Sequence, residues 1–530
     1  MNPPNTPSRM HADEHSLHDP AVLAQIVVTD RAQRRRILIA MCVGLVAVIA
    51  SMSGLNVAVQ QISADLGASQ SMLLWIINGY TMVLAALLLP IGAVGDRWGR
   101  KPVLLAGLSV FAVASVVAAL AGSAVVMLLA RLVAGAGAAM IMPVTLSVVT
   151  SSFPEEERAN AVGVWAGFAG AGGILGMFFS AAMVDYISWR WLFLMPIALC
   201  VISMVMTIAN VDNSREVHEH SFDWGGGVCS TVAIGGLVMA FHEGPENGWT
   251  YWLTVLGLVA AVVGLVAFIW LELRHEMPLL DVRLFSNRSL ASGSTNLLIV
   301  FAVMFGLFFV LIQFLRAVLG YSALKAATGL LPMALILMPL SSIAPRLVRR
   351  TGTRLLLIVG TCVVALGLLA SATIPSVSGG YVSVLPALLL IGLGMGLVMT
   401  PSTVAITESL PAEKQGVASA LNDTVREVGG ALGVALLGSV VNAGYRSGVS
   451  SAVAGLPAEV QSAVKGGIGQ ALYVAPQLGE AGPGVVAAAR EAFVDGWHQA
   501  MWVGVAIAGL AVLLLVFRGP EDDRPAVRPR

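Results

Sequence analysis

Long apolar runs separated by short polar segments dominate this chain. Each run stays nearly free of charge for roughly 20 residues, which is the length that a helix needs to cross about 30 Å of hydrocarbon. The pattern therefore predicts an all-α integral membrane protein with about fourteen transmembrane helices. The predicted spans are Ile37–Val59, Leu74–Val94, Val103–Ala121, Val125–Thr150, Ala161–Met183, Trp191–Ala209, Gly226–Phe241, Tyr251–Leu271, Asn296–Phe314, Ala326–Ile343, Leu355–Ile374, Tyr381–Val404, Val417–Val441 and Ala500–Phe517.

Polar segments divide these spans into blocks. Residues 1–36 are polar and contain several prolines, so we expect a disordered cytoplasmic tail and no cleaved signal peptide. Six spans follow in residues 37–210, two in residues 211–288 and six in residues 289–517, before a second tail at 518–530. The last block includes a long outer loop at 444–499 with two amphipathic stretches. Packing on the membrane surface and gating of a substrate path are the alternative roles for this loop.

A weak internal repeat indicates two related halves. The segment 99–105 echoes 352–357, each after a span that ends in basic residues, and the glycine-rich stretches 163–176 and 429–438 form a second pair. Repeats of this kind are typical of transporters in which two halves surround a cavity at the membrane midplane. The two spans in 211–288 are then an insertion between two six-helix pseudo-repeat halves.

Basic residues predict the orientation. When the N-terminus is placed inside, most Lys and Arg fall in inner segments, which is the bias expected of cytoplasmic loops. The outer segments keep only Arg190, Arg316, Lys325, Arg446, Lys465 and Arg490. Both termini are therefore predicted to be cytoplasmic.

Composition narrows the function. Of the 530 residues 57% are hydrophobic and 11% charged, which excludes an ordinary soluble protein. The 30 basic residues balance the 30 acidic ones, so net charge offers no argument for nucleic-acid binding. The four cysteines lie in apolar runs and are interpreted as packing residues. No nucleotide-binding, metal-ligating or hydrolase motif is present in the sequence, so we expect neither an enzyme nor a bound cofactor. Any transport is then expected to be driven by gradients across the membrane.

Short motifs follow one another along the chain: Trp75 with Tyr80, the segment 92–101, the segment Arg131–Gly137, Pro278-Leu279 with Leu284-Phe285, the segment Leu319–Leu324, and Gly416–Ser419 leading to the segment Val425–Gly430. In this order and spacing they resemble the motifs of the fourteen-span drug:proton antiporter branch of the major facilitator superfamily. The resemblance covers nearly the whole chain and implies a multidrug efflux transporter of the plasma (inner) membrane.

The charged segment Gly95–Pro102 joins the second and third spans. The resemblance implies that Asp96 is held by the start of the Val417–Val441 helix and forms a cytoplasmic latch, because anions are favoured at helix N-termini. The residues assigned to gating are Gly95, Asp96, Arg97, Gly99, Arg100 and Lys101. The alternative for the cations is that they only fix topology. The second half has Arg349 at the position of Asp96, so the latch is expected to be one-sided.

Arg131 is predicted to lie about 10 Å below the outer surface, where an unpaired charge is costly and usually functional. The family usually has an acid on the first span at the position of Ser51, and the acid is absent here. Arg131 is therefore expected to bond Ser51, Ser53, Asn56 or backbone carbonyls. A coupling role and a merely structural role both fit. The missing acid argues against a strict preference for cationic substrates.

The proton carrier is assigned to the thirteenth span. Asp423 and Glu427 lie four residues apart on one helical face, and the repulsion between two carboxylates favours a proton on one of them. Glu427 is the deeper acid and is the predicted carrier, with Asp423, Arg426 and Arg131 tuning it, and Asp185 and Glu243 are weaker alternatives. In the fifth span Met177 replaces the family's usual proline, which puts tight coupling in question.

A central cavity lined from both halves is expected to bind a small lipophilic substrate. The proton is the expected coupling ion. The lipid bilayer surrounds the protein, and no nucleic acid is expected to bind. The chain is predicted to be a monomer. The candidate substrate-binding residues are Ser51, Asn56, Trp75, Asn78, Tyr80, Asn296 and Gln313. Proton-driven export of drugs or secondary metabolites is the favoured function. A facilitator or uptake carrier with weak coupling, and a non-transporting membrane sensor or scaffold, are the alternatives.

Overall fold

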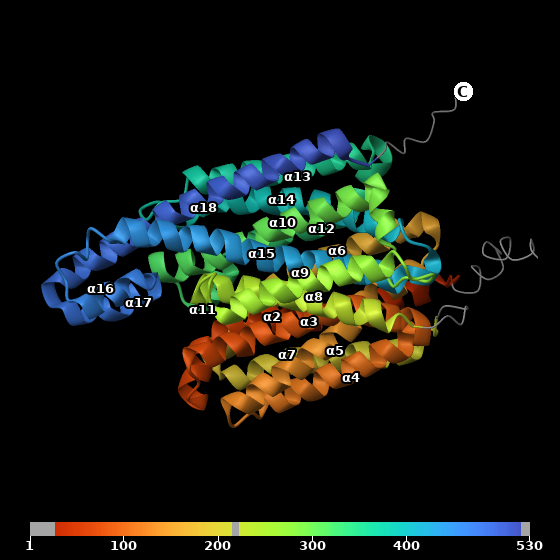
Figure 1. Cartoon of the computed structure of the whole chain (residues 1–530), viewed down its shortest axis with the longest axis horizontal. Helices are drawn as coiled ribbons and strands as arrows, with labels where there is room; N and C mark the ends of the chain where they lie inside the picture. Colours follow the sequence, from red (N-terminus) through yellow and green to blue (C-terminus); the bar gives the residue numbers. More distant parts are fainter. Residues whose placement is uncertain (1–26, 215–221, 521–530) are drawn as a thin grey trace, which may run out of the picture.

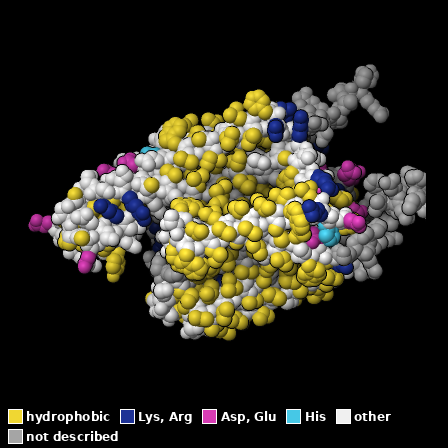
Figure 2. All heavy atoms as spheres, viewed as in Figure 1, with side chains coloured by type: hydrophobic (Ala, Val, Ile, Leu, Met, Phe, Trp, Pro, Cys, Tyr) yellow, Lys and Arg dark blue, Asp and Glu magenta, His cyan; other side chains and the backbone are white. Residues whose placement is uncertain are grey.

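The computed structural model describes residues 27–214 and 222–520, and this part of the chain is built from helices without a strand. Within these described ranges fourteen helices are long and apolar enough to cross a membrane, which confirms the predicted number of spans. They lie side by side along the long axis of the molecule (Figure 1), and the hydrophobic side chains cover the middle of the visible face while charged ones gather toward its ends (Figure 2). Of the predicted tails at 1–36 and 518–530, residues 1–26 and 521–530 lie outside the described residues. The expectation of disorder is wrong for residues 31–36, which form the first turns of a helix.

The helices of the first half are α2 (Arg31–Leu66), α3 (Gln70–Trp98), α4 (Arg100–Ala119), α5 (Ala124–Ser152), α6 (Glu155–Tyr186) and α7 (Leu194–Asn210), with the short η2 (Trp189–Phe193) before α7. The inserted pair is α8 (Trp224–Asn247) and α9 (Trp252–Glu272). The second half follows after η3 (Val282–Ser286) and comprises α10 (Arg288–Gln313), η4 (Phe314–Val318), α11 (Ala323–Thr328), α12 (Leu331–Thr351), α13 (Thr353–Thr373), α14 (Gly380–Thr407), η5 (Ala412–Lys414), α15 (Gln415–Val449), α16 (Ala458–Lys465), α17 (Ile468–Val474), η6 (Ala475–Ala481) and α18 (Gly482–Arg518).

Most of these helices begin earlier and end later than the predicted spans, because capping residues outside the apolar runs start them. Asp30 accepts hydrogen bonds from the backbone N–H groups of Ala32 and Gln33 and so starts α2 before its apolar run. Ser69 does the same for α3 through the N–H of Met72. Apolar composition predicts the part of a helix that lies in the membrane, whereas the caps set its ends.

The two halves repeat the same helix packing. Helix α2 packs on α6 as α10 packs on α15, α4 packs on α5 as α13 packs on α14, and α3 packs on α5 as α12 packs on α14. The halves meet where α3 contacts α15 and where α6 contacts α12. Gly99 and Gly352, which the sequence repeat aligns, both have φ in the left-handed region, at 108° and 85°. The prediction of two related six-helix halves is confirmed.

The inserted helices α8 and α9 form a closely packed pair that lies over the junction of the halves (Figure 1). Their backbones approach so closely that a Cβ atom on Gly236 would lie 2.7 Å from the carbonyl oxygen of Gly257. Helix α8 contacts α3 of the first half and α15 of the second. The insertion therefore covers one side of the α3–α15 contact.

The outer segment 444–499 is helical along most of its length. Helix α15 continues to Val449 and α18 begins at Gly482, so both take up part of the predicted loop. The short helices α16 and α17 project beyond the other helices at one end of the molecule (Figure 1). The Tyr445 hydroxyl donates a hydrogen bond to the carbonyl of Val464 (2.9 Å), which ties α16 to α15. The role of this segment stays a prediction.

Candidate functional site

Asp96 lies at the N-terminus of α15, in the other half of the protein. Its carboxylate accepts hydrogen bonds from the N–H of Gly416 (2.8 Å) and the N–H of Val417 (3.1 Å), and it forms an ion pair with Arg100 (2.8 Å). Arg100 also donates to the carbonyl of Ala412 (3.3 Å). Both charged side chains are 4% exposed. An anion at the positive end of a helix dipole, paired with a buried guanidinium, joins the cytoplasmic ends of α3 and α15.

The other residues of the 95–101 segment have different surroundings. Lys101 donates to the carbonyl of Ile208 at the end of α7 (3.1 Å), and Arg97 lies 5.9 Å from the centre of the Trp98 ring. Gly99 turns the chain between α3 and α4, and Gly95 lies against Val144. Of the three predicted cations, only Arg100 therefore takes part in the contact with α15 among the described residues.

A pocket beside this contact connects it to the linkers of the inserted helices. Its lining includes Asp96 and Arg97 of α3, Asp223 before α8, Pro278 after α9 and Lys414 before α15. Lys414 donates to the carbonyl of Pro278 (2.9 Å). The Pro278-Leu279 motif thus lies against the start of the helix that binds Asp96.

The outer ends of the halves are also joined. The N–H of Leu324, at the start of α11, donates to the carboxylate of Asp185 at the end of α6 (3.2 Å). Ser322 caps α11 and Gly320, at φ 68°, makes the preceding turn. The Leu319–Leu324 motif therefore places a backbone donor against Asp185, so Asp185 is held by the protein.

Arg131 is buried in the first half with neutral partners. It donates to the Ser51 hydroxyl (3.0 Å) and to the carbonyl of Ile76 (3.4 Å), and its guanidinium lies 4.0 Å from the centre of the Tyr80 ring. No carboxylate pairs with it in the described part of the chain. The interaction with Tyr80 is a cation–π contact, which is stronger away from water. The Tyr80 hydroxyl in turn donates to the carbonyl of Val48 (3.1 Å).

Replacing Ser51 with Ala is expected to lower the free energy of unfolding by about 1.5–3 kcal/mol, because a buried guanidinium would lose a hydrogen-bond partner. Thermal unfolding of the purified protein in detergent measures the loss. Ser109→Ala is the control, since that exposed hydroxyl bonds only to Leu105 of its own helix and should change stability by less than about 0.5 kcal/mol. Equal melting temperatures for the Ser51 and Ser109 variants would contradict the prediction.

Helix α15 carries three charged residues at the junction of the halves. Asp423 is fully buried and pairs with Arg426 (3.2 Å), and Asn422 donates to the same carboxylate oxygen (3.1 Å). Arg426 lies 4.6 Å from the centre of the Phe301 ring and 5.5 Å from that of Trp165. Because Trp165 belongs to α6 and Phe301 to α10, this cation is held between aromatic rings from both halves.

Glu427 differs from Asp423 in having no hydrogen bond or ion pair with any described residue, although it is only 7% exposed. It lies about 18 Å along the helix from Gln415 at 1.5 Å per residue, which is near the middle of a membrane about 30 Å thick. It interacts electrostatically with Arg426, Asp423 and Tyr80. Tyr80 therefore interacts with Arg131 of the first half and, electrostatically, with Glu427 of the second.

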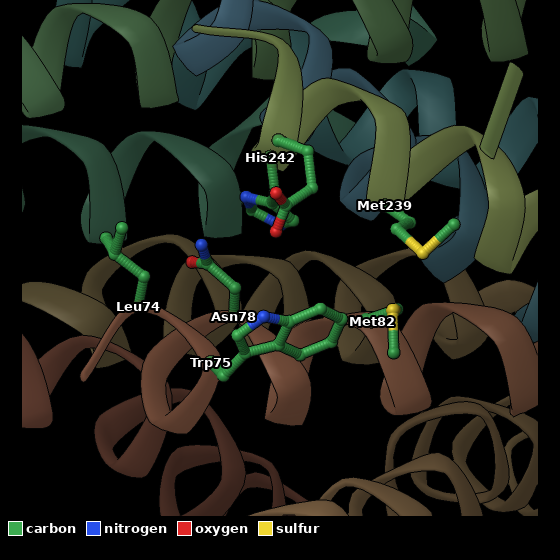
Figure 3. Close-up of a pocket in the computed structure, with 7 residues that line it drawn as sticks. Leu74, Trp75, Asn78, Met82, Met239 and His242 are labelled. Carbon is green, nitrogen blue, oxygen red and sulfur yellow. The ribbon is translucent and has the colours of Figure 1, made fainter. Parts of the chain in front are cut away.

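The candidate substrate-binding residues are not brought together in one cavity. Ser51 and Tyr80 surround Arg131, whereas Trp75 and Asn78 line a pocket between α3 and α8. Asn296 accepts a hydrogen bond from Thr361 inside the second half (3.1 Å). Gln313 bonds only weakly to Phe309 of its own helix (3.4 Å), and the Asn56 side chain lies outside what the structure describes. Trp75 and Asn78 lie on the face of α3 that α8 covers (Figure 3), and the lining of a central cavity by the candidate residues stays a prediction.

Sequence reasoning missed Trp165 and Phe301. Both lie in spans rich in apolar residues, where an aromatic side chain is more often a packing residue. The one available signal was Arg426, because a cation inside a span needs partners and aromatic rings can supply them. Sequence reasoning also missed Met239 and His242, which face Trp75 and Asn78 from α8.

Comparisons with known proteins agree with this arrangement. Residues 40–434 match the family described as Major Facilitator Superfamily. The chain is 33% identical to Multidrug resistance protein Stp of Mycobacterium tuberculosis, over 77% of this chain and 75% of the relative. It is 32% identical to Multidrug efflux pump LfrA of Mycolicibacterium smegmatis, over 87% of this chain and 92% of the relative. The fold is similar to that of the human organic anion transporter MFSD10, with a TM-score of 0.60 at 14% identity, over 91% of this chain and 99% of that one.

Proposed function

Since the chain belongs to the Major Facilitator Superfamily, we propose that it exports lipophilic small molecules, such as drugs, antibiotics or secondary metabolites, in exchange for protons. It is a multi-pass protein of the plasma membrane and a transporter, not an enzyme. Stp is named as a multidrug resistance protein and LfrA as a multidrug efflux pump, and both names support export as the direction. We propose that the monomer is the working unit.

The observation that carries proton coupling is Glu427. A carboxylate in mid-membrane is costly unless it is paired or protonated, and Glu427 has no bonded partner in the described part of the chain. Asp423, by contrast, already pairs with Arg426. Glu427 is therefore the group that can take up a proton from one side and release it to the other without breaking an ion pair. Arg426, between rings of both halves, can sense that change of charge.

The contact of Asp96 with α15 supplies the gate of this cycle. Alternating access requires the cytoplasmic ends of α3 and α15 to part and close again. When they part, the Asp96 carboxylate loses two backbone donors but keeps Arg100, which is on its own side of the gate. The gate can therefore open without leaving an unpaired buried anion. Arg97, Lys101, Gly95 and Gly99 hold the segment that carries Asp96 and Arg100 in position.

A facilitator or uptake carrier is the second candidate, and one observation favours it. Arg131 binds the neutral hydroxyl of Ser51, so the first half offers it no carboxylate whose protonation could be linked to substrate. Coupling would then depend on the second half alone. A sensor or scaffold would move no substrate at all.

Proton flux in proteoliposomes separates the three functions. Purified protein is reconstituted with a pH-sensitive dye inside the vesicles, and a lipophilic drug is added outside without an imposed proton gradient. Antiport predicts a substrate-dependent change of internal pH. Drug movement without a pH change would instead identify a facilitator, and no movement of either would identify a sensor or scaffold.

A further inference from the structure

We infer that the protein holds a regulatory proton between the carboxyl groups of Asp223 and Glu272, at the cytoplasmic ends of the inserted helices, and that loss of this proton at alkaline pH loosens the gate. These two residues form the proton pair. The effect on the gate rests on the proposed function, whereas the shared proton does not. The proposed transport cycle uses neither residue, since its carrier is Glu427 and its gate is formed by Asp96.

The two carboxyl groups of the proton pair face the same point. Asp223 caps α8, because its Oδ1 atom accepts a hydrogen bond from the N–H of Gly226 (2.7 Å). Glu272 ends α9, and its Oε2 atom accepts from the N–H of Leu280 (3.1 Å). A Cβ atom on Gly226 would lie 2.6 Å from Oδ2 of Asp223 and closer still to Oε1 of Glu272. Glycine at this position therefore leaves room for two carboxyl oxygens, and the two side chains interact directly.

The two oxygens that border Gly226 lack a donor. Glu272 is fully buried and Asp223 is 8% exposed. Neither Oε1 of Glu272 nor Oδ2 of Asp223 receives a hydrogen bond from a described residue. Buried polar atoms in proteins are nearly always satisfied, and two carboxylates that share a site do not both stay ionised. A proton held between them satisfies both oxygens, because one carboxyl group then donates and the other accepts.

One cation lies near the proton pair without replacing the proton. Lys414 of η5 acts on Glu272 electrostatically, but its ammonium group donates to the carbonyl of Pro278 (2.9 Å). Arg283 of η3 donates to the carbonyl of Leu273 (3.0 Å), next to Glu272 in the sequence. With one proton the pair carries a single negative charge, which Lys414 balances. A second negative charge would have no such partner.

The pocket beside the gate connects the proton pair to the cytoplasm. Asp223 lines this pocket together with Asp96 and Arg97 of α3. Its volume of about 70 Å³ holds several water molecules. The two charges of α3 are engaged elsewhere, since Asp96 accepts from the start of α15 and Arg97 lies against the ring of Trp98. Water in the pocket can therefore take the proton from Asp223 and return it.

The segment 278–280 links the proton pair to the gate. Glu272 holds the N–H of Leu280, and two residues earlier the carbonyl of Pro278 holds Lys414, directly before α15. Loss of the proton leaves two like charges in contact, and their repulsion drives Glu272 away from the start of α8. The segment then moves with Glu272 and releases Lys414, beside the helix N-terminus that binds Asp96. An alkaline cytoplasm loosens the gate, and a neutral one keeps it closed.

Infrared spectroscopy of the purified full-length protein tests the shared proton. At neutral pH the wild-type spectrum minus that of Glu272→Gln should contain the C=O stretching band of a protonated carboxyl group. Glutamine keeps the shape of the side chain and donates an amide N–H to Asp223, so the variant needs no proton there. Glu276→Gln, which removes an exposed acid four residues later, should give no such band. A difference spectrum of Glu272→Gln without the band would overturn the shared proton.

Labelling of a cysteine behind the gate tests the link. Ser419 on α15 is fully buried, and Ser419→Cys is made in a background without the native cysteines. Its reaction with a membrane-impermeant methanethiosulfonate is timed with and without Glu272→Gln, so that the same thiol is compared at each pH. At alkaline pH the intact pair should give labelling at least about fivefold faster, which is the lower end of typical couplings between sites. At neutral pH the two rates should agree.

Asp223→Asn supplies an independent variant. Asparagine still caps α8 and donates an amide N–H to Glu272, so labelling at alkaline pH should be as slow as in Glu272→Gln. Size-exclusion profiles establish that each variant is folded, and Asp223→Asn takes the place of Glu272→Gln in both measurements if the latter does not fold. Equal labelling rates for the intact pair and these variants at alkaline pH would overturn the link to the gate. Wild-type protein that shows the infrared band but moves no drug would remove the proposed function alone.

Discussion

Glu427→Gln is expected to abolish substrate-driven proton movement while the protein stays folded. Glutamine keeps the shape of the side chain but cannot exchange a proton, and Glu427 has no ion pair in the described residues whose loss would disturb the fold. In proteoliposomes the change of internal pH on addition of drug should fall to the level of protein-free vesicles. Drug should still cross the membrane down its own gradient, because the substrate path is unchanged.

Two controls make this result specific. Glu480→Gln removes an exposed acid from η6 and should leave proton flux at the wild-type level. Asp423→Asn should behave differently from Glu427→Gln, since it leaves Arg426 without its ion-pair partner and should lower stability as well as transport. Undiminished drug-driven acidification or alkalinisation by Glu427→Gln would show that another group carries the proton.

Gly92→Val is expected to prevent closure of the cytoplasmic ends of α3 and α15. A Cβ atom on Gly92 would lie 2.5 Å from both the Cβ of Ala420 and the carbonyl oxygen of Gly416, and neither of these atoms can move aside. Overpacking of this kind costs about 1–3 kcal/mol, which shifts the balance between closed and open gates by about 5–150-fold. Because the gate would no longer close, Asp96 could not form its hydrogen bonds to Gly416 and Val417, and the rate of transport should fall.

Accessibility of a cysteine reports the state of this gate. Ser419, on α15 near the contact, is fully buried, so Ser419→Cys in a background without the four native cysteines should react slowly with a membrane-impermeant maleimide applied to the cytoplasmic side. Adding Gly92→Val should accelerate the reaction. Gly509→Val on α18 is the matched control, because a Cβ there meets open space. Slow labelling together with full transport in Gly92→Val would show that the gate does not need this close approach.

Much of the fold could be predicted from the sequence because its causes are local. A run of about 20 apolar residues becomes a spanning helix whatever its neighbours do, since backbone polar groups in hydrocarbon must bond within their own segment. The echo of Gly99 in Gly352 likewise reflects a local need for positive φ between two helices. These local requirements predicted the fourteen spans and the two related halves.

The site was less predictable because helix faces and partners are not local. A neutral partner for Arg131 could be expected from the sequence, because Ser51 stands where related transporters usually have an acidic residue. The Ser51 hydroxyl is that partner. Trp75 and Asn78 could not be assigned to the correct face of α3, because nothing in their own span shows that α8 covers it. Trp165 and Phe301 were missed for the same reason, since both come to Arg426 from helices far away in sequence.

The sequence by itself determined that this chain crosses the membrane about fourteen times, that its motifs are those of the superfamily, and which few charges lie inside the spans. Segment length, apolarity and residue identity carry that information directly. The tertiary structure alone decided which of these charges have partners. Asp96 lies on the N-terminus of α15, Asp423 pairs with Arg426, and Glu427 has no bonded partner among the described residues, because the cost of a buried charge depends on what the other half of the protein places beside it.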